Sequence, residues 1–132
     1  MMKALVWYMD RVFESAPSNR EQHVDGHLFT GIPASPGRYT GRVRVIRDES
    51  EFDRLQPGEV LVCPITSPAW SVLFPSVGAL VTDTGGVLSH PAIIAREYQV
   101  PAVVATGNAT GLLHDGQLVT VNGSSGEIEL QP

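Results

Sequence analysis

The stretch "GALVTDTGGVLSHPAIIAREYQ", residues 78–99, determines how this chain is interpreted. Its first part, 78–83, is a compact apolar run that ends in polar residues, which is typical of a buried strand. Two glycines follow, and the run 91–99 has the composition of a helix. Pro91 is tolerated only in the first turn of a helix, because it lacks an N–H and fixes φ. The pattern therefore predicts a strand, a tight glycine turn and a helix.

One histidine, His90, stands at the start of this helix, with Ser89 or His90 itself as the N-cap. A helix N-terminus disfavours the imidazolium and favours negative charge nearby, which predicts a neutral, nucleophilic imidazole. Gly85 and Gly86 let the backbone turn tightly beside the ring. Gly86 in particular is expected to tolerate no side chain. Together with Ser89 and the free N–H groups, these glycines form a candidate cradle for the oxygens of a phosphoryl group.

Composition limits the classes of protein to consider. The 132 residues fit one domain, and 42% of them are hydrophobic, which suffices for a core. The net charge is −5 with no basic patch, so we expect no nucleic-acid partner. The apolar runs are far shorter than the ~18 residues that span a bilayer, so we expect no membrane contact. A single cysteine, Cys63, forms no internal disulfide and fits a cytoplasmic location.

The chain divides into two expected parts. Residues 1–25 are predicted to be an N-terminal helical arm and linker, with an amphipathic helix over 3–15. Residues 26–132 alternate strands with short helices and close with a hairpin around Asn122 and Gly123. Further strands are expected at 37–46, 58–64 and 101–106, and short helices or helical turns at 48–55, 67–77 and 108–116. This order predicts a compact α/β domain with a mixed sheet and short helices.

An ordered motif follows the strand 78–83 and carries a family resemblance. Its residues are Gly85, Gly86, Ser89, His90, Ala95, Arg96, Pro101, Ala102 and Val103. With this motif, the chain resembles the phosphohistidine (swivelling, mobile) domain of the phosphoenolpyruvate-utilising enzymes. The resemblance continues over 31–46, 58–70 and 115–130. It is nearest to the phosphoenolpyruvate synthase and rifampin phosphotransferase branches.

The resemblance implies a phosphocarrier domain with the swivelling β/β/α fold. His90 would be phosphorylated transiently and would carry the phosphoryl group between an ATP-grasp nucleotide site and a substrate site, for pyruvate, phosphoenolpyruvate or a similar acceptor. Those sites would lie on other domains of the same or a partner polypeptide, because 132 residues leave no room for a barrel of typically ~250 residues. We therefore expect this chain to bind no cofactor, and ATP and Mg²⁺ to be held by the partner domains. The chain would be part of a phosphotransferase, and whether it is an enzyme alone stays open.

Several residues near the glycines and His90 have expected roles of their own. Leu88 stands where several family members carry a threonine, whose hydroxyl would bond the imidazole. Asp83 and Thr84 flank the glycines and are expected to cap the turn. Arg96 lies almost two turns along the helix from His90, where it would either steady the phosphate or form a surface salt bridge. One cysteine and four scattered histidines do not supply the ligands of a zinc site, so no metal is expected.

Two alternative functions stay open. The first is a non-catalytic swivelling or assembly module that has lost phosphotransfer. The intact Gly-Gly and Ser-His pairs argue against it, because a scaffold needs neither. The second is a hydrolase with Ser89 as nucleophile and His90 as base. Adjacent residues at a helix start rarely point at each other, and no G-x-S-x-G turn is present, so the carrier is favoured.

Overall fold

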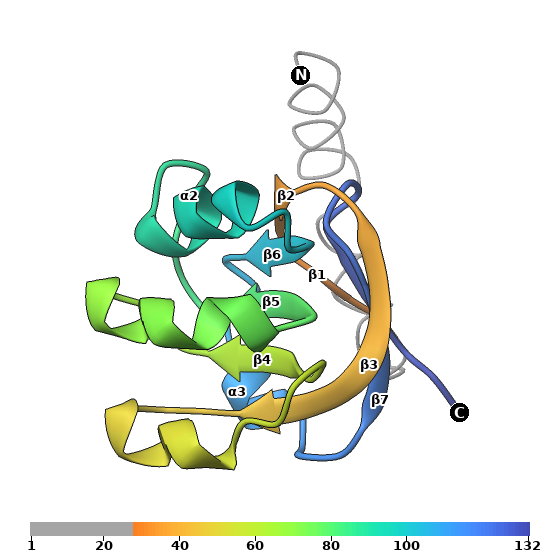
Figure 1. Ribbon diagram of the computed structural model, residues 1–132. Coiled ribbons are helices and arrows are strands. Elements are labelled where there is room, and N and C mark those ends of the chain that lie inside the picture. The colour runs from red at the N-terminus through yellow and green to blue at the C-terminus, as the bar shows by residue number, and fades with distance from the viewer. Residues whose placement is uncertain (1–27) are drawn as a thin grey trace.

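The protein is described by a computed structural model, of which residues 28–132 are described (Figure 1). The arm and linker expected over 1–25 lie outside the described residues. The elements are β1 Leu28–Thr30, β2 Ile32–Ser35, β3 Arg38–Val45, η1 Glu49–Arg54, β4 Val60–Cys63, η2 Pro68–Ser76, β5 Ala79–Thr82, α2 His90–Glu97, β6 Ala102–Val104, α3 Ala109–Leu112, β7 Leu118–Asn122 and β8 Glu127–Leu130.

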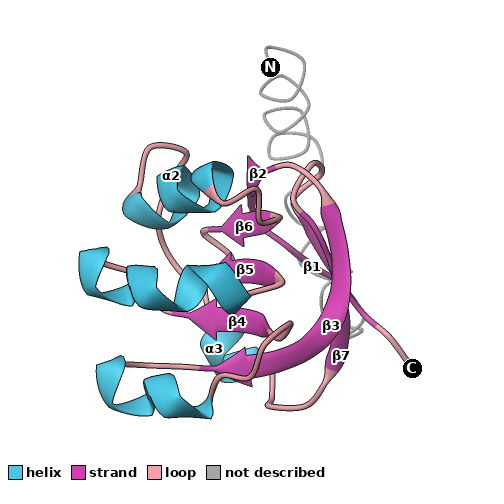
Figure 2. Ribbon diagram, viewed as in Figure 1, coloured by secondary structure: helices cyan, strands magenta, loops and turns pink. Residues whose placement is uncertain are grey.

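The strands form one eight-stranded mixed sheet in the order β1-β8-β7-β3-β4-β5-β6-β2. Strands β3 to β6 are parallel neighbours, whereas β2, β7, β8 and β1 pair antiparallel. Figure 2 shows α2, η1 and η2 together along one side of the sheet. The expected α/β class with a mixed sheet and short helices is confirmed. No helix in the described part of the chain is long and apolar enough to cross a membrane.

A single extended segment joins the two ends of the sheet. Strands β1 and β2 stand at opposite ends of the strand order, yet only Gly31 separates them in the chain. The N–H of Gly31 donates to the carbonyl of Gly126 over 2.8 Å, and a Cβ on Gly31 would lie 2.5 Å from the carbonyl oxygen of Val104. The sequence pattern missed both strands, because Gly31 and Pro33 interrupt their alternation.

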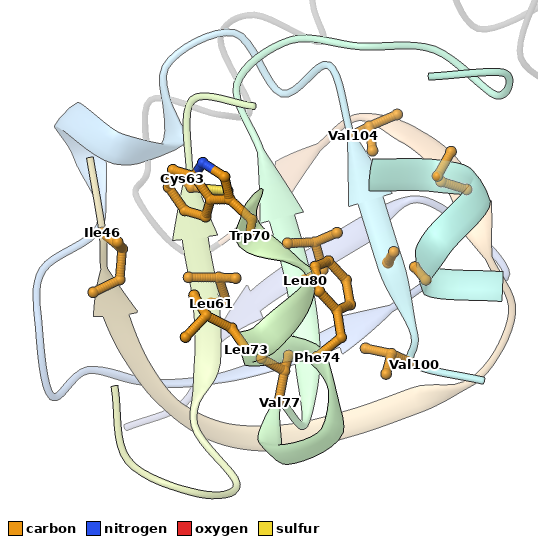
Figure 3. Close-up of a cluster of buried hydrophobic side chains, with 14 residues drawn as sticks. Ile46, Leu61, Cys63, Trp70, Leu73, Phe74, Val77, Leu80, Val100 and Val104 are labelled. Atoms are coloured by element: carbon orange, nitrogen blue, oxygen red, sulfur yellow. The ribbon is translucent and has the colours of Figure 1, made fainter. Parts of the chain in front are cut away.

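Two apolar cores lie on opposite faces of the parallel strands, because successive strand residues point to opposite faces. One core gathers the large side chains under the helices, among them Leu61, Trp70 and Phe74, as Figure 3 shows. The other is built mainly from valines, such as Val60 and Val62, and continues into β7 and β8. Strand β4, with all four residues buried, contributes to both cores and is thereby fixed in place.

Cys63 ends β4 inside the first core. It is fully buried, and burial, together with the charge of Asp83, raises the pKa of its thiol well above the ordinary value. A thiol with a raised pKa stays protonated and is a poor nucleophile. The residue therefore packs as a small apolar side chain.

The closing hairpin differs in its turn from the expectation. Strands β7 and β8 pair antiparallel as predicted, with Asn122 opposite Glu127. The connection spans the four residues 123–126, however, and not a two-residue Asn-Gly turn. The side-chain oxygen of Asn122 accepts the N–H groups of Ser124 and Ser125, each over 3.0 Å. A left-handed Gly126 (φ +86°) then completes the turn. Asn122 thus shapes a longer loop through its side chain, a common role of asparagine in turns.

Candidate functional site

The site lies at the edge where the parallel strands β4 and β5 end. Parallel neighbours place their carboxyl ends at the same edge of a sheet, so the segments that follow them meet there. After β4 the chain reaches Thr66, and after β5 it forms the loop 85–89 that leads into α2. Figure 1 shows α2 next to β6 and β2, and α2 also contacts β5. The fold therefore brings Thr66 to His90, although 24 residues separate them in the chain.

His90 is the first residue of α2, with Ser89 as its N-cap and Pro91 in the first turn, as the sequence predicts. Its Nδ1 lies 2.7 Å from Oγ1 of Thr66. Thr66 is only 5% exposed, whereas His90 is half-buried. The buried hydroxyl of Thr66 thus occupies Nδ1 of the imidazole, whereas Nε2 has no hydrogen-bond partner among the described residues. Which ring nitrogen reacts in a histidine site is set by the hydrogen bond of the other.

Thr66 is the functional residue that the sequence reasoning missed. The signal was present: Thr66 is the first hydroxyl after the apolar run of β4, at the edge where the histidine loop starts. Leu88 stands where several family members carry a threonine that would bond the imidazole, and Thr66 supplies this hydroxyl instead. Leu88 is 81% exposed and takes no part in holding the ring. The hydroxyl that contacts the imidazole comes instead from Thr66, in the segment that follows β4.

The two glycines of the loop have different roles. Gly85 has φ +121°, a conformation that L side chains rarely adopt, and a Cβ there would lie 2.9 Å from Oγ of Ser89. Gly86 lies outside the left-handed region and would place a Cβ in open space, with no atom within 4 Å. The expectation that Gly86 tolerates no side chain is therefore wrong. Gly85 is the position that requires glycine, because only it combines a positive φ with a close neighbour.

Ser89 closes the loop on itself. Its Oγ donates to the carbonyl of Gly86 over 2.6 Å, and its N–H bonds the same oxygen over 3.1 Å. The hydroxyl is thus engaged with the backbone, and Nδ1 of His90 is engaged with Thr66. A serine nucleophile needs a hydrogen bond to its histidine base, so this arrangement speaks against the hydrolase alternative.

The loop keeps backbone donors for an anion. Within residues 28–132, the N–H groups of Gly86, Val87 and Leu88 have no hydrogen-bond partner. Pro91 has no N–H to offer in the first turn of α2. Donors that could meet phosphoryl oxygens are therefore present in the loop beside the helix start, and the loop's conformation matters for binding.

Asp83 and Thr84 anchor the start of the loop, and they do so on neighbouring segments. The carboxylate of Asp83 accepts the N–H and the hydroxyl of Thr110, over 2.9 and 2.6 Å. The hydroxyl of Thr84 donates to the carbonyl of Pro64 over 3.2 Å. From the sequence, both residues were predicted to cap the glycine turn. The structure instead uses them to tie the end of β5 to α3 and to the segment after β4.

Among the described residues, Arg96 does not form the surface salt bridge that was one of the two roles expected for it. One guanidinium nitrogen, Nη1, donates to the carbonyl of Ala34 over 2.8 Å, and the other, Nη2, donates to the carbonyl of Val87 over 2.7 Å. Within the described chain it has no carboxylate partner. The side chain links β2 to the histidine loop.

Metal-binding groups do not gather at this edge. Across residues 28–132, no cluster of three or more histidine, cysteine or carboxylate side chains is placed to hold a metal ion. The chemistry of the described site rests on one imidazole, one hydroxyl and backbone groups.

Comparison with known proteins places the chain in a family. The family model described as "PEP-utilising enzyme, mobile domain" matches residues 55–126. The chain is 55% identical over 108 residues to the uncharacterized phosphotransferase YvkC of Bacillus subtilis, covering 82% of this chain and 13% of that protein. It is 48% identical over 111 residues to the rifampicin phosphotransferase of Streptomyces sviceus, covering 84% of this chain and 13% of that protein.

A solved structure agrees with this placement. The NMR solution structure of an Enzyme I protein matches with a TM-score of 0.53 and 34% identity, over 61% of this chain and 34% of that chain. The curated relatives are much longer, since this chain spans 13% of the length of each one named above. The matched residues include the loop, His90 and Thr66. The chain therefore belongs to the mobile-domain family of the PEP-utilising enzymes.

Proposed function

We propose that His90 is a phosphoryl carrier, which accepts the group at an ATP-grasp nucleotide site and delivers it to a substrate site on another domain. ATP and Mg²⁺ belong to the partner domains in this proposal. Pyruvate, phosphoenolpyruvate or a similar acceptor is the substrate. Support comes from the membership of the family, from the names of relatives that are phosphotransferases, and from their greater length, which leaves room for both partner sites.

The observation that carries the proposal is the hydrogen bond of 2.7 Å between Thr66 and Nδ1 of His90. With Nδ1 held, Nε2 presents its lone pair to the incoming phosphorus. The new N–P bond forms as the P–O bond of the donor breaks, and the electron pair leaves with the donor's oxygen. The proton on Nδ1 stays in the bond to Thr66. Covalent transfer through a side chain splits one difficult step into two easier ones.

The test is phosphate labelling of the chain. The purified chain is incubated with the ATP-grasp domain of its own phosphotransferase, Mg²⁺ and ATP labelled in its phosphates. We expect label that is labile to acid, stable to base and located by mass spectrometry in the peptide containing His90. Label on a serine, or no label while the nucleotide domain is active, would favour the non-catalytic module instead.

Removing the hydroxyl that holds the ring should slow phosphorylation. Thr66→Val replaces the hydroxyl by a methyl group of similar size and leaves Nδ1 without its partner. We expect the labelling rate to fall about tenfold, which corresponds to one hydrogen bond of roughly 1.4 kcal/mol. Thr66→Ser keeps a hydroxyl and should retain most of the rate. Equal rates for the valine and serine variants would show that the bond has no role in transfer.

The paired variants Gly85→Ala and Gly86→Ala separate the two glycines. Gly85→Ala forces a side chain into φ +121° and against Ser89, so we expect loss of about 2 kcal/mol of stability and at least a tenfold slower labelling. Gly86→Ala enters open space and should stay within about twofold of the unaltered chain. Thermal unfolding and labelling rates measure both effects. If Gly86→Ala lost more stability and labelling rate than Gly85→Ala, the loop conformation described here would not be the one that transfers phosphate.

A further inference from the structure

The loop that carries the unpaired N–H groups has few contacts of its own. Val87 is 50% exposed and Leu88 is 81% exposed, so the tip of the loop buries little apolar surface. Inside the loop, both bonds of Ser89 end on the carbonyl of Gly86. A segment with so few buried contacts opens easily unless another group ties it to the fold.

Arg96 supplies that tie. Its guanidinium bonds the carbonyl of Val87, at the tip of the loop, and the carbonyl of Ala34 in β2. Ala34 is buried, and the neighbouring Ser35 pairs with Ala102 of β6, so this end of the bridge rests on the sheet. The arginine itself stands on α2, the helix that begins at His90. One planar group therefore fixes the loop relative to the sheet and to the histidine helix.

Arg96 acts at a distance from the reacting atoms. It lies six residues beyond His90, which is about 9 Å along the axis of an α-helix. We propose that Arg96 is a positioning residue for phosphoryl transfer, which holds the loop 85–89 in the conformation that presents its N–H groups to the phosphoryl oxygens on His90. This inference rests on the proposed role of His90 as phosphoryl acceptor.

The guanidinium is suited to this role in a way that an ammonium is not. Arginine presents several N–H groups in a rigid plane and can bond two carbonyls at once, whereas lysine offers one point of contact. Arg96→Lys keeps the charge and loses the two-point bridge. Arg96→Ala loses both. The comparison between them distinguishes a bridge from a long-range effect of charge.

The test uses the 132-residue chain alone with potassium phosphoramidate, a small phosphoryl donor that needs no protein partner. In this reaction the imidazole nitrogen bonds to phosphorus, the reagent's P–N bond breaks, and its nitrogen leaves as ammonia. The imidazole keeps the proton of its other nitrogen until solvent removes it. The rate of His90 phosphorylation is followed by mass spectrometry, and the ¹⁵N signals of its imidazole by NMR.

We expect Arg96→Ala to react about tenfold more slowly, because misplacement of a positioned group by about 1 Å can cost up to 100-fold in rate. The fold should be kept, and the N–H signals of Val87 and Leu88 should broaden or shift. Arg96→Lys should recover less than half of the lost rate. The matched control is Arg42→Ala, which removes another exposed arginine that donates to a backbone carbonyl, that of Gly116. It should stay within about twofold of the unaltered chain.

Three results would overturn the inference. These are an unchanged rate in Arg96→Ala, full recovery in Arg96→Lys, and a loss in Arg42→Ala as large as that in Arg96→Ala. If Arg96→Ala does not fold, the lysine variant alone decides, since a wild-type rate there rules out the bridge. Failure of the proposed function would look different. ATP would then leave His90 unlabelled, while the phosphoramidate rates of the variants could still be compared.

Discussion

Replacing His90 by alanine is expected to abolish phosphate incorporation from ATP while the domain stays folded. No other described side chain combines a free imidazole nitrogen with a position beside the loop 85–89. The substitution leaves the buried hydroxyl of Thr66 without its partner, which costs about 1–3 kcal/mol. The melting temperature should therefore fall by several degrees, and the label should vanish completely. Labelling and circular dichroism on the same preparation separate the two effects.

The matched control is His114→Ala. His114 is exposed and stands next to the Asp115-Gly116 turn, and the hydrogen bonds described for it, both with Gln117, use its backbone N–H and carbonyl and not its imidazole. Removing the imidazole of His114 should change neither the amount of label nor the melting temperature measurably. Residual acid-labile phosphate on the His90→Ala chain would place the acceptor elsewhere and would contradict the proposed function.

The second large effect concerns stability. Gly123→Ala should destabilise the domain by about 3 kcal/mol or more, a large fraction of the stability of a small domain. A Cβ on Gly123 would lie 1.8 Å from the carbonyl oxygen of Ser35 and 2.7 Å from the backbone nitrogen of Ala102. Both are backbone atoms in neighbouring strands, so no side chain can move aside. Urea unfolding followed by circular dichroism measures the loss.

Gly116→Ala provides the comparison for this prediction. Gly116 has φ +88° but no atom within 4 Å of an added Cβ. The cost there is backbone strain alone, roughly 1–2 kcal/mol. Gly123 lies outside the positive-φ region, so its cost is crowding alone. If the two variants lost equal stability, the hairpin turn would not be packed against Ser35 and Ala102 as described.

Much of the site was predictable because it is local. The start of α2 follows from Pro91, since its missing N–H confines it to a first turn, and the neighbours of His90 in sequence are its neighbours in space. The buried strands β4 and β5 follow from short apolar runs. The ordered motif around His90 then carried the family resemblance, and the family is confirmed.

The features that the sequence did not predict depend on contacts between segments that are distant in the chain. Hydrophobic periodicity gives no information on such contacts. Thr66 reaches His90 only because β4 and β5 are parallel neighbours. The difference between Gly85 and Gly86 depends on one φ angle and on the position of Ser89. Strands β1 and β2 are held by pairing with β8 and β6, and not by a pattern of their own. Arg96 likewise finds its partners through the packing of α2 on β2.

The pairing of β1 with β8 has a consequence for how such a domain can be built into longer proteins. Leu28 lies opposite Glu129, so the described fold begins and ends on neighbouring strands, which are about 5 Å apart in a sheet. Figure 1 shows α2 on the other side of the molecule from the end of the chain. A host protein can therefore accept this domain in a single surface loop without separating the ends of that loop. Transplanting residues 28–130 into an unrelated host should leave both folds intact, with α2, which begins at His90, on the side away from the C-terminal point of attachment.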